Sequence, residues 1–314
     1  MNANRLMGAW LTSCLFFMAV GPANATSPPA PGFVELRAVG KTFEGPSAIP
    51  HGWTTFRFVN ASPMVHFALI DRLPEGVTVE DFNGLMVAFQ AAMDAMNSGD
   101  AEAIEAAFGR FPAWVGDLAR NGGPGFLSAG MTGEATVYLE PGQYVIECYV
   151  KSDGIFHTTP PGEGVPGMVL PLTVSEVPNG RAEPSANATV TIRNDGFELT
   201  DGALNTGRNT LRVEFAEQQA FPSFVGNDIH IMRVDGADDI ARADGWFDWR
   251  LPAGLEDPAP VTLLGGLNDL AAGEHGYITV DLDAGDYALI AEVPAPAAAG
   301  LVLPFSVGEA DPAE

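Results

Sequence analysis

The sequence predicts a mainly β protein that consists of two tandem Greek-key β-sandwiches, the first of which carries a helical insertion. Short segments that alternate apolar and polar residues indicate strands, and abundant glycines (36) and prolines (25) place turns between them. Blocks of sequence that recur in the same order indicate that the sandwich occurs twice. The length of 314 residues and the hydrophobic content of 46% suffice for two domains with cores of their own.

The repeat is visible in three matched blocks. The strand GMVLPLTV at residues 167–174 returns as GLVLPFSV at residues 300–307, and the other matches pair residues 52–58 with 207–213 and residues 138–144 with 281–287. The spacing between blocks differs between the copies, so insertions fall in loops while the strands are kept. We therefore assign residues 33–176 to the first repeat, the polar stretch 177–185 to a linker, and residues 186–308 to the second repeat.

Residues 80–119 of the first repeat depart from the strand pattern. Their apolar residues stand three or four positions apart, which predicts a helix, and Ser98 is expected to cap a second helix. The first of these two helices would carry Met86, Met93 and Met96, whose thioethers are one alternative set of Cu(I) ligands. A methionine stripe at helical spacing is far more often core packing, and packing is the preferred interpretation.

The N-terminus has the pattern of a secretory signal peptide. Arg5 supplies a positive charge, an apolar run follows from Leu6 to Val20, and Ala23-Asn24-Ala25 forms a small-residue cleavage site. This predicts a signal peptide over residues 1–25, cleavage after Ala25, and a periplasmic or secreted protein. Lipoprotein processing at Cys14 is the second choice, because the apolar run continues past that cysteine. No later stretch approaches the roughly 20 apolar residues of a membrane span, so no membrane insertion is expected after cleavage.

Charge and cysteine content narrow the function classes. The formal net charge of −25 repels nucleic acid, so no nucleic-acid partner is expected. Only Cys14 and Cys148 are present, and the first would leave with the signal peptide, so the mature chain forms no internal disulfide. In an oxidising compartment, Cys148 is therefore interpreted either as a buried, inert thiol or as a metal thiolate.

Four residues of the first repeat form a candidate metal site. They are His66, Cys148, His157 and Met168, which supply two imidazoles, one thiolate and one thioether. A thiolate and two imidazoles in a trigonal arrangement suit copper, with a weak axial thioether that tunes the reduction potential. Each residue also has a structural alternative, because a buried cysteine or methionine packs well in a core and a loop histidine is often exposed.

The second repeat serves as an internal control for this site. Cys148 corresponds to Ala291 and Met168 to Leu301, while the loop that contains His157 is replaced by an apolar turn. Three of the four candidate ligands are thus absent together, which is expected if they form one site. His66 keeps a counterpart in His230, so a shared structural role, such as a hydrogen bond from the imidazole to the loop, remains an alternative for both.

Both repeats, about residues 33–176 and 186–308, resemble the cupredoxin family of small blue copper proteins, and the ligand motifs lie in the first. The run from Phe58 to His66 is similar to the family's first-histidine motif, in which an asparagine precedes a ligand histidine. The run from Gly142 to Met168 is similar to the family's Cys–His–Met ligand loop. The resemblance implies that His66, Cys148 and His157 are equatorial copper ligands and that Met168 is the axial ligand.

The ligand loop departs from the family pattern in its length. The family usually has only a few residues between these ligands, whereas eight residues separate Cys148 from His157 and ten separate His157 from Met168. A long loop can still close, because closure entropy grows only logarithmically with length. The spacing leaves a more open, tetragonal or Cu(I)-favouring site as an alternative to ordinary blue-copper geometry.

The functional prediction is an exported copper-binding protein with one mononuclear site, which acts in electron transfer or copper handling. Its expected partner is a redox protein or a copper donor. The alternative is a metal-free interaction module of the same fold. An enzyme is not expected, because the five histidines form no paired motif for a trinuclear copper cluster and no hydrolase or nucleotide-binding motif occurs.

Overall fold

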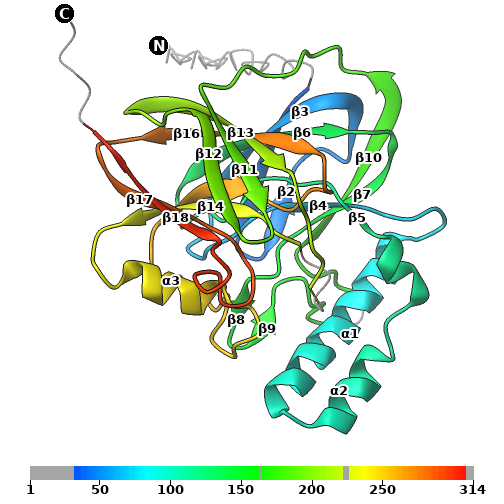
Figure 1. Ribbon diagram of the computed structural model, residues 1–314. Coiled ribbons are helices and arrows are strands. Elements are labelled where there is room, and N and C mark those ends of the chain that lie inside the picture. Colours follow the sequence, from blue (N-terminus) through cyan, green and yellow to red (C-terminus); the bar gives the residue numbers. More distant parts are fainter. Residues whose placement is uncertain (1–31, 163, 222–225, 309–314) are drawn as a thin grey trace, which may run out of the picture.

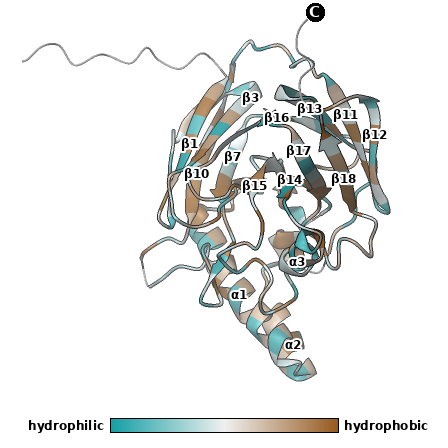
Figure 2. Cartoon of the chain, turned by 90° about the vertical axis from the view of Figure 1, so that its left-hand side faces the viewer, coloured by the Kyte–Doolittle hydropathy of each residue, from teal (hydrophilic) through white to brown (hydrophobic). Residues whose placement is uncertain are grey.

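A computed structural model describes residues 32–162, 164–221 and 226–308, and it shows a mainly β protein, as the sequence predicts. Two sandwiches lie side by side, and the helices lie at one end of them (Figures 1 and 2). The predicted signal peptide over residues 1–25, with Cys14, lies outside the described residues. None of the helices in the described part of the chain has the length and apolar character needed to cross a membrane.

In the second repeat the strands form two separate sheets, whereas in the first repeat one strand pairs into both sheets and joins them. The first repeat is built from β1 (Phe33–Val39), β2 (Thr42–Glu44), β3 (Ala48–Asn60), β4 (Leu69–Arg72), β5 (Ala119–Arg120), β6 (Thr132–Leu139), β7 (Gly142–Glu147) and β10 (Val169–Pro178), with the short hairpin β8 (Lys151–Ser152) and β9 (Ile155–Phe156). The second repeat is built from β11 (Ala188–Arg193), β12 (Gly196–Gly202), β13 (Gly207–Phe215), β14 (Ile229–Val234), β15 (Leu263–Leu267), β16 (His275–Leu282), β17 (Gly285–Ile290) and β18 (Val302–Val307).

The strand pairings confirm the duplication. In the first repeat β1 pairs with β2 and runs parallel to β3, β3 pairs with β6, and β7 lies between β4 and β10. In the second repeat β11 pairs with β12 and runs parallel to β13, β13 pairs with β16, and β17 lies between β14 and β18. The molecule is therefore a tandem pair of β-sandwiches with the same strand arrangement.

The two repeats share a continuous sheet. Strands β6 and β16 pair antiparallel, with Ala135 opposite Ile278, so that a sheet of the first repeat continues into a sheet of the second. The ring of Trp53 in β3 lies 5.6 Å from the ring of Tyr277 in β16. One buried hydrophobic cluster contains residues of both repeats, so the repeats pack as one body.

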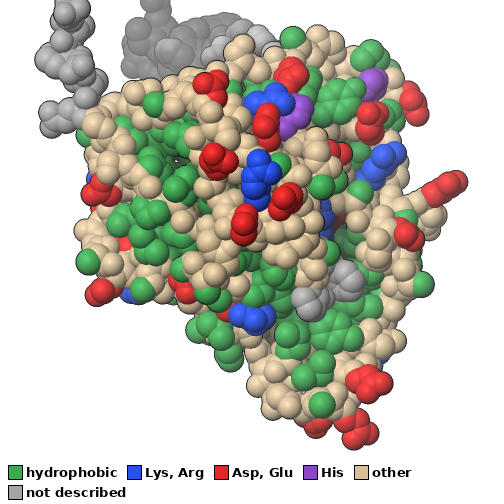
Figure 3. Space-filling model, in the orientation of Figure 1, with side chains coloured by type: hydrophobic (Ala, Val, Ile, Leu, Met, Phe, Trp, Pro, Cys, Tyr) green, Lys and Arg blue, Asp and Glu red, His purple; other side chains and the backbone are tan. Residues whose placement is uncertain are grey.

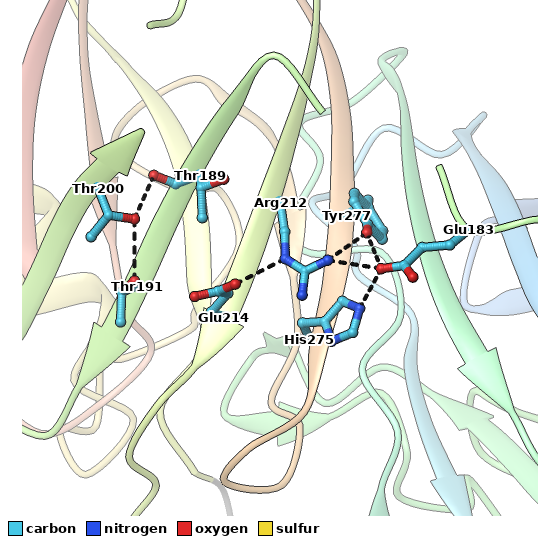
Figure 4. A network of polar contacts seen from close by, with 8 residues as sticks. All are labelled: Glu183, Thr189, Thr191, Thr200, Arg212, Glu214, His275 and Tyr277. Carbon is cyan, nitrogen blue, oxygen red and sulfur yellow. Dashed lines mark hydrogen bonds and ion pairs between the residues drawn. The ribbon is translucent and has the colours of Figure 1, made fainter. Parts of the chain in front are cut away.

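The segment between the repeats is fastened to the second repeat by Glu183 (Figure 4). Its Oε1 atom accepts a hydrogen bond from Arg212 at 2.8 Å, lies 2.6 Å from His275 Nε2, and accepts a hydrogen bond from the Tyr277 hydroxyl. His275 belongs to no predicted motif, yet its imidazole also lies 5.4 Å from the Trp53 ring of the first repeat. These contacts hold the segment at the junction of the two sheets.

The predicted helical insertion consists of α1 (Val79–Ser98), α2 (Ala101–Phe108) and the 3-10 helix η1 (Ala113–Asp117). Helix α2 is capped by Asp100, whose carboxylate accepts hydrogen bonds from two backbone N–H groups, so the prediction that Ser98 caps it is wrong. Met86 and Met93 of α1 are buried in hydrophobic clusters and Met96 packs against one, which confirms the packing interpretation of the methionines. A third helix, α3 (Asp239–Phe247), lies below the second sandwich in Figure 2.

Candidate metal centre

The four predicted ligands come from loops at one end of the first sandwich. His66 lies in the loop between β3 and β4, and Cys148 directly follows β7. His157 follows the β8–β9 hairpin, and Met168 directly precedes β10. All four side chains are buried, with exposed fractions of 0% for His66 and Cys148, 3% for His157 and 1% for Met168.

Three donor atoms converge at this end. The Nδ1 atom of His66 lies 3.4 Å from Cys148 Sγ, and the Nδ1 atom of His157 lies 4.0 Å from the same sulfur. The ligand atoms of these three residues all lie within 4.8 Å of one another. The structure thus brings together the thiol and both imidazoles that the sequence singled out, and both histidines present the same ring nitrogen to the sulfur.

Asn60 holds the loop that contains His66. Its side-chain amide donates hydrogen bonds to the carbonyl oxygens of Met64 and Leu127, and its Oδ1 atom accepts one from the Ser62 N–H. The backbone of His66 exchanges two hydrogen bonds with Leu127. The asparagine of the predicted motif therefore orders the loop rather than facing the site, which explains why it precedes the ligand at this spacing.

The long ligand loop is closed at its base by backbone hydrogen bonds. The N–H of Cys148 donates to the Met168 carbonyl at 3.3 Å, and the N–H of Met168 donates to the His157 carbonyl at 2.7 Å. At Gly167 a Cβ atom would lie 1.9 Å from the carbonyl oxygen of Thr158, so only glycine permits this close approach. The ten residues between His157 and Met168 therefore do not separate the two ligands in space.

Ser152 orients the ring of His157, which the sequence did not indicate. The Ser152 Oγ atom lies 2.8 Å from Nε2 of His157, so Nδ1 is the nitrogen that faces Cys148. A hydrogen bond to the distal nitrogen of a ligand histidine fixes the ring orientation and its tautomer. Ser152 is on a two-residue strand five positions before His157, and no sequence motif marks that contact.

Burial keeps both imidazoles neutral and the thiol protonated when no cation is present. Burial lowers the pKa of His66 to about 4 and the pKa of His157 to about 3. Burial raises the pKa of the Cys148 thiol to about 12, against the opposite effect of the backbone N–H groups of Phe67 and Val150. The ring nitrogens therefore have free lone pairs at neutral pH, and the thiolate forms only when a cation replaces the proton.

The helical insertion covers one side of the ligand loop. Gln90 of α1 accepts hydrogen bonds from the Phe156 N–H and the Thr159 hydroxyl, and its amide donates to the carbonyl of Gly154. The ring of Phe89 packs 5.3 Å from the ring of Phe156. Helix α1 thus braces the hairpin that leads to His157.

The second repeat also packs against the ligand loop. Lys151 is 3% exposed, and its ammonium group donates hydrogen bonds to the carbonyls of Leu251 and Pro252. Its backbone exchanges hydrogen bonds with Leu255 and Asp257 of the same segment. The candidate site is therefore closed by both repeats, although all four predicted ligands belong to the first.

The second repeat keeps the backbone geometry of the site without its soft donors. The N–H of Ala291 donates to the Leu301 carbonyl at 3.1 Å, which matches the bond from Cys148 to Met168 in the first repeat. Both Ala291 and Leu301 are fully buried. Aliphatic side chains thus fill the positions that a thiol and a thioether occupy in the first copy.

No protein-family model matches the sequence, and no curated protein matches it. Among solved structures, the chain is similar to auracyanin B, with 22% identity over 40% of this chain and 91% of that chain and a TM-score of 0.30. Auracyanin A, a "blue" copper protein from Chloroflexus aurantiacus, is 22% identical over 46% of this chain and 99% of its own, with a TM-score of 0.27. A copper nitrite reductase from Nitrosomonas europaea is 13% identical over 90% of this chain and 95% of its own, with a TM-score of 0.22. At these values the similarities add nothing to the evidence from the contacts in the chain itself.

Proposed function

We propose that this chain is an exported electron-transfer protein that holds one copper ion in its first repeat. His66, Cys148 and His157 would hold the ion through two ring nitrogens and one thiolate sulfur, and Met168 would supply a thioether. The observation that supports this most directly is the convergence of two imidazole Nδ1 atoms on a buried thiol sulfur, at 3.4 and 4.0 Å.

The donor atoms fit a single copper ion. Bonds of first-row metals to nitrogen and sulfur are roughly 2.0–2.3 Å long, so donors around a trigonal centre stand roughly 3.5–4 Å apart. The measured separations from Cys148 Sγ to the two imidazoles fall close to this range. One thiolate and two imidazoles are also the donor types that copper takes in electron-transfer sites.

The protein contributes rigidity and exclusion of water. Copper, when bound, supplies a one-electron change between its two oxidation states. Asn60 fixes the loop of His66, and Ser152 fixes the ring of His157. The backbone hydrogen bond from the Cys148 N–H to the Met168 carbonyl fixes the chain at the other two residues. Donors that are already in place do not need to move when the charge of the ion changes, which favours rapid electron exchange.

Burial of the ligands favours electron transfer over copper delivery. A protein that donates or collects copper must let a competing ligand reach the ion. Here all four predicted ligands are at most 3% exposed, and both helix α1 and the second repeat cover the loop. Electron transfer needs no such ligand exchange, and we therefore propose a redox protein as the partner.

On the face in Figure 3, acidic side chains are scattered rather than gathered into one patch, so this face does not define where the partner binds.

Copper loading of the purified mature protein tests the proposal. We expect one Cu(II) ion per chain, an intense thiolate-to-copper absorption band in the visible spectrum, and slow loss of copper to an excess of a strong chelator. Stoichiometric binding with release in seconds would instead support copper handling. A chain that takes up copper in neither oxidation state would support the metal-free interaction module.

The substitution Met168→Leu is expected to raise the reduction potential while copper stays bound. The second repeat shows that leucine fits this backbone position, because Leu301 is buried there with the same hydrogen bond. Loss of the axial thioether removes a donor that stabilises Cu(II). We expect an increase of at least about 60 mV, which is a tenfold change in the relative stability of the two oxidation states. A redox titration measures it, with Met93→Leu as the control for a buried methionine in α1. Equal potentials for wild type and Met168→Leu would remove Met168 from the site.

A further inference from the structure

The side chain of Met64 connects the two loops that carry the predicted imidazole ligands. Met64 stands two positions before His66, in the loop between β3 and β4. Its sulfur accepts a hydrogen bond from the hydroxyl of Ser152 at 3.6 Å, a length that suits the large sulfur atom as a weak acceptor. Ser152 belongs to β8, in the hairpin that leads to His157. The contact therefore joins the loop of the first imidazole to the loop of the second.

The main chain of Met64 is fixed by other contacts. Its N–H group donates to the Ser62 hydroxyl at 3.2 Å, and its carbonyl accepts a hydrogen bond from the Asn60 side chain at 2.8 Å. The next N–H group, that of Val65, donates to Asp257 of the second repeat at 2.8 Å. The sulfur is therefore presented to the hairpin from a backbone whose position does not depend on the hairpin.

The Ser152 hydroxyl has one hydrogen and two neighbours. Among the residues that the structure describes, its Oγ atom is within hydrogen-bond distance of the Met64 sulfur, at 3.6 Å, and of His157 Nε2, at 2.8 Å. A thioether has no hydrogen to donate, so it can only accept. When the hydroxyl donates to Met64, its oxygen must accept from His157. Nε2 is then the nitrogen that carries the ring proton.

This arrangement leaves the other ring nitrogen of His157 free. Burial lowers the pKa of His157 to about 3, so at neutral pH the ring has a single proton, on one of its two nitrogens. With that proton on Nε2, the lone pair of Nδ1 points to the side of Cys148 Sγ, which lies 4.0 Å away. The opposite tautomer would place an N–H group there and leave no lone pair for a cation.

The second repeat organises an imidazole from the same position. Asp228 stands two positions before His230, which is the spacing between Met64 and His66. Nδ1 of His230 accepts a hydrogen bond from the Phe126 N–H at 3.3 Å, so Nε2 carries the proton and donates it to the Asp228 carboxylate at 2.6 Å. A side chain at this position thus accepts from an imidazole in both repeats, directly in the second and through a serine in the first.

We propose that Met64 is a positioning residue that selects the tautomer of His157 through Ser152. The hydrogen bonds run in one direction, from Nε2–H of His157 to the Ser152 oxygen and from the Ser152 hydroxyl to the Met64 sulfur. Each of the two bonds strengthens the other, because successive hydrogen bonds polarise one another. The inference rests on the copper site proposed above, which needs a free Nδ1, but the tautomer is a property of the protein without copper.

NMR spectroscopy of the imidazole nitrogens in the metal-free protein at neutral pH tests the tautomer directly. We expect wild type to have a protonated Nε2 and an unprotonated Nδ1 at His157. In Met64→Leu the Ser152 hydroxyl loses its acceptor and can turn toward Nε2, so we expect both tautomers. Leucine nearly conserves the volume of methionine, and the variant should therefore fold. Met93→Leu in α1 is the control and should match wild type.

Copper affinity shows whether Met64 acts through Ser152. Ser152→Ala removes an outer-shell partner of a ligand histidine and should weaken copper binding by roughly 10–100-fold. Met64→Leu should weaken it by a smaller factor, and in the Ser152→Ala background it should have no further effect. An equal loss in both backgrounds would mean that Met64 acts by packing alone, which overturns the proposal.

Two NMR results would also overturn the proposal. One is a proton on Nδ1 of His157 in wild type, which can be read even if no variant folds. The other is a Met64→Leu protein with the same single tautomer as wild type. If the tautomers are as expected but the protein binds no copper, the role of Met64 stands and the proposed function fails.

Discussion

Replacement of Cys148 with serine is expected to abolish the intense visible absorption of the copper-loaded protein. The band requires a sulfur bound to copper, and the serine hydroxyl is a harder donor that does not ionise at neutral pH. Because Cys148 Sγ is the atom on which His66 and His157 converge, copper affinity should fall by at least a factor of about 100, the upper end of what loss of an outer-shell partner costs. Visible spectroscopy and competition with a chelator of known affinity measure both effects.

The matched control for this variant lies in the second repeat. Ala291 occupies the position of Cys148 and is equally buried, so Ala291→Ser also places a hydroxyl in the interior at the end of a matching strand. It should keep the absorption band and one bound copper ion. If Cys148→Ser retains the band, or if Ala291→Ser loses it, the spectrum reports folding or another site rather than a bond to this sulfur.

Replacement of Arg120 with methionine is expected to destabilise the fold by about 3–5 kcal/mol, the usual cost of removing one partner from a buried ion pair. The guanidinium of Arg120 lies 2.8 Å from Asp71 and 3.4 Å from Glu147. Those carboxylates are 0% and 2% exposed, and methionine would leave them without this compensating charge. Urea unfolding at pH 7 measures the change in the free energy of unfolding.

A surface arginine provides the comparison for this effect. Arg208 also contacts two carboxylates, Glu134 at 2.6 Å and Asp281 at 3.5 Å, but its side chain is 58% exposed. Exposed ion pairs typically contribute about 0–1 kcal/mol, so Arg208→Met should be nearly neutral. If both variants lose a similar free energy of unfolding, burial of the ion pairs that Arg120 forms does not explain the loss.

The two repeats, and the grouping of Cys148 with two histidines, could be predicted from the sequence because both leave local signals. Strands alternate with period two, and the turns between them carry glycine and proline, so matched blocks remain recognisable in both copies. The joint replacement of Cys148 by Ala291 and of Met168 by Leu301 marked a set of residues that change together. The structure then brought Cys148 together with His66 and His157.

The loop length was no guide to where the backbone ends of the loop lie. The hydrogen bond between His157 and Met168 and the close approach at Gly167 bring the backbones of these two residues together, while the more open site that the loop length suggested stays a prediction. The number of residues in a loop sets the entropy cost of closing it. Where the two ends of the loop lie is decided by the hydrogen bonds of the folded structure.

By itself, the sequence determined which chemical groups are present and which strands carry them, because residue type and short-range periodicity are properties of the chain alone. Only the tertiary structure decided that Ser152 orients His157, that Lys151 closes the site against the second repeat, and that Met64 meets Ser152. Such contacts join segments that are far apart in the chain or on opposite sides of a turn. Their distances are set by how the two sandwiches pack, and no local pattern in the sequence encodes that packing.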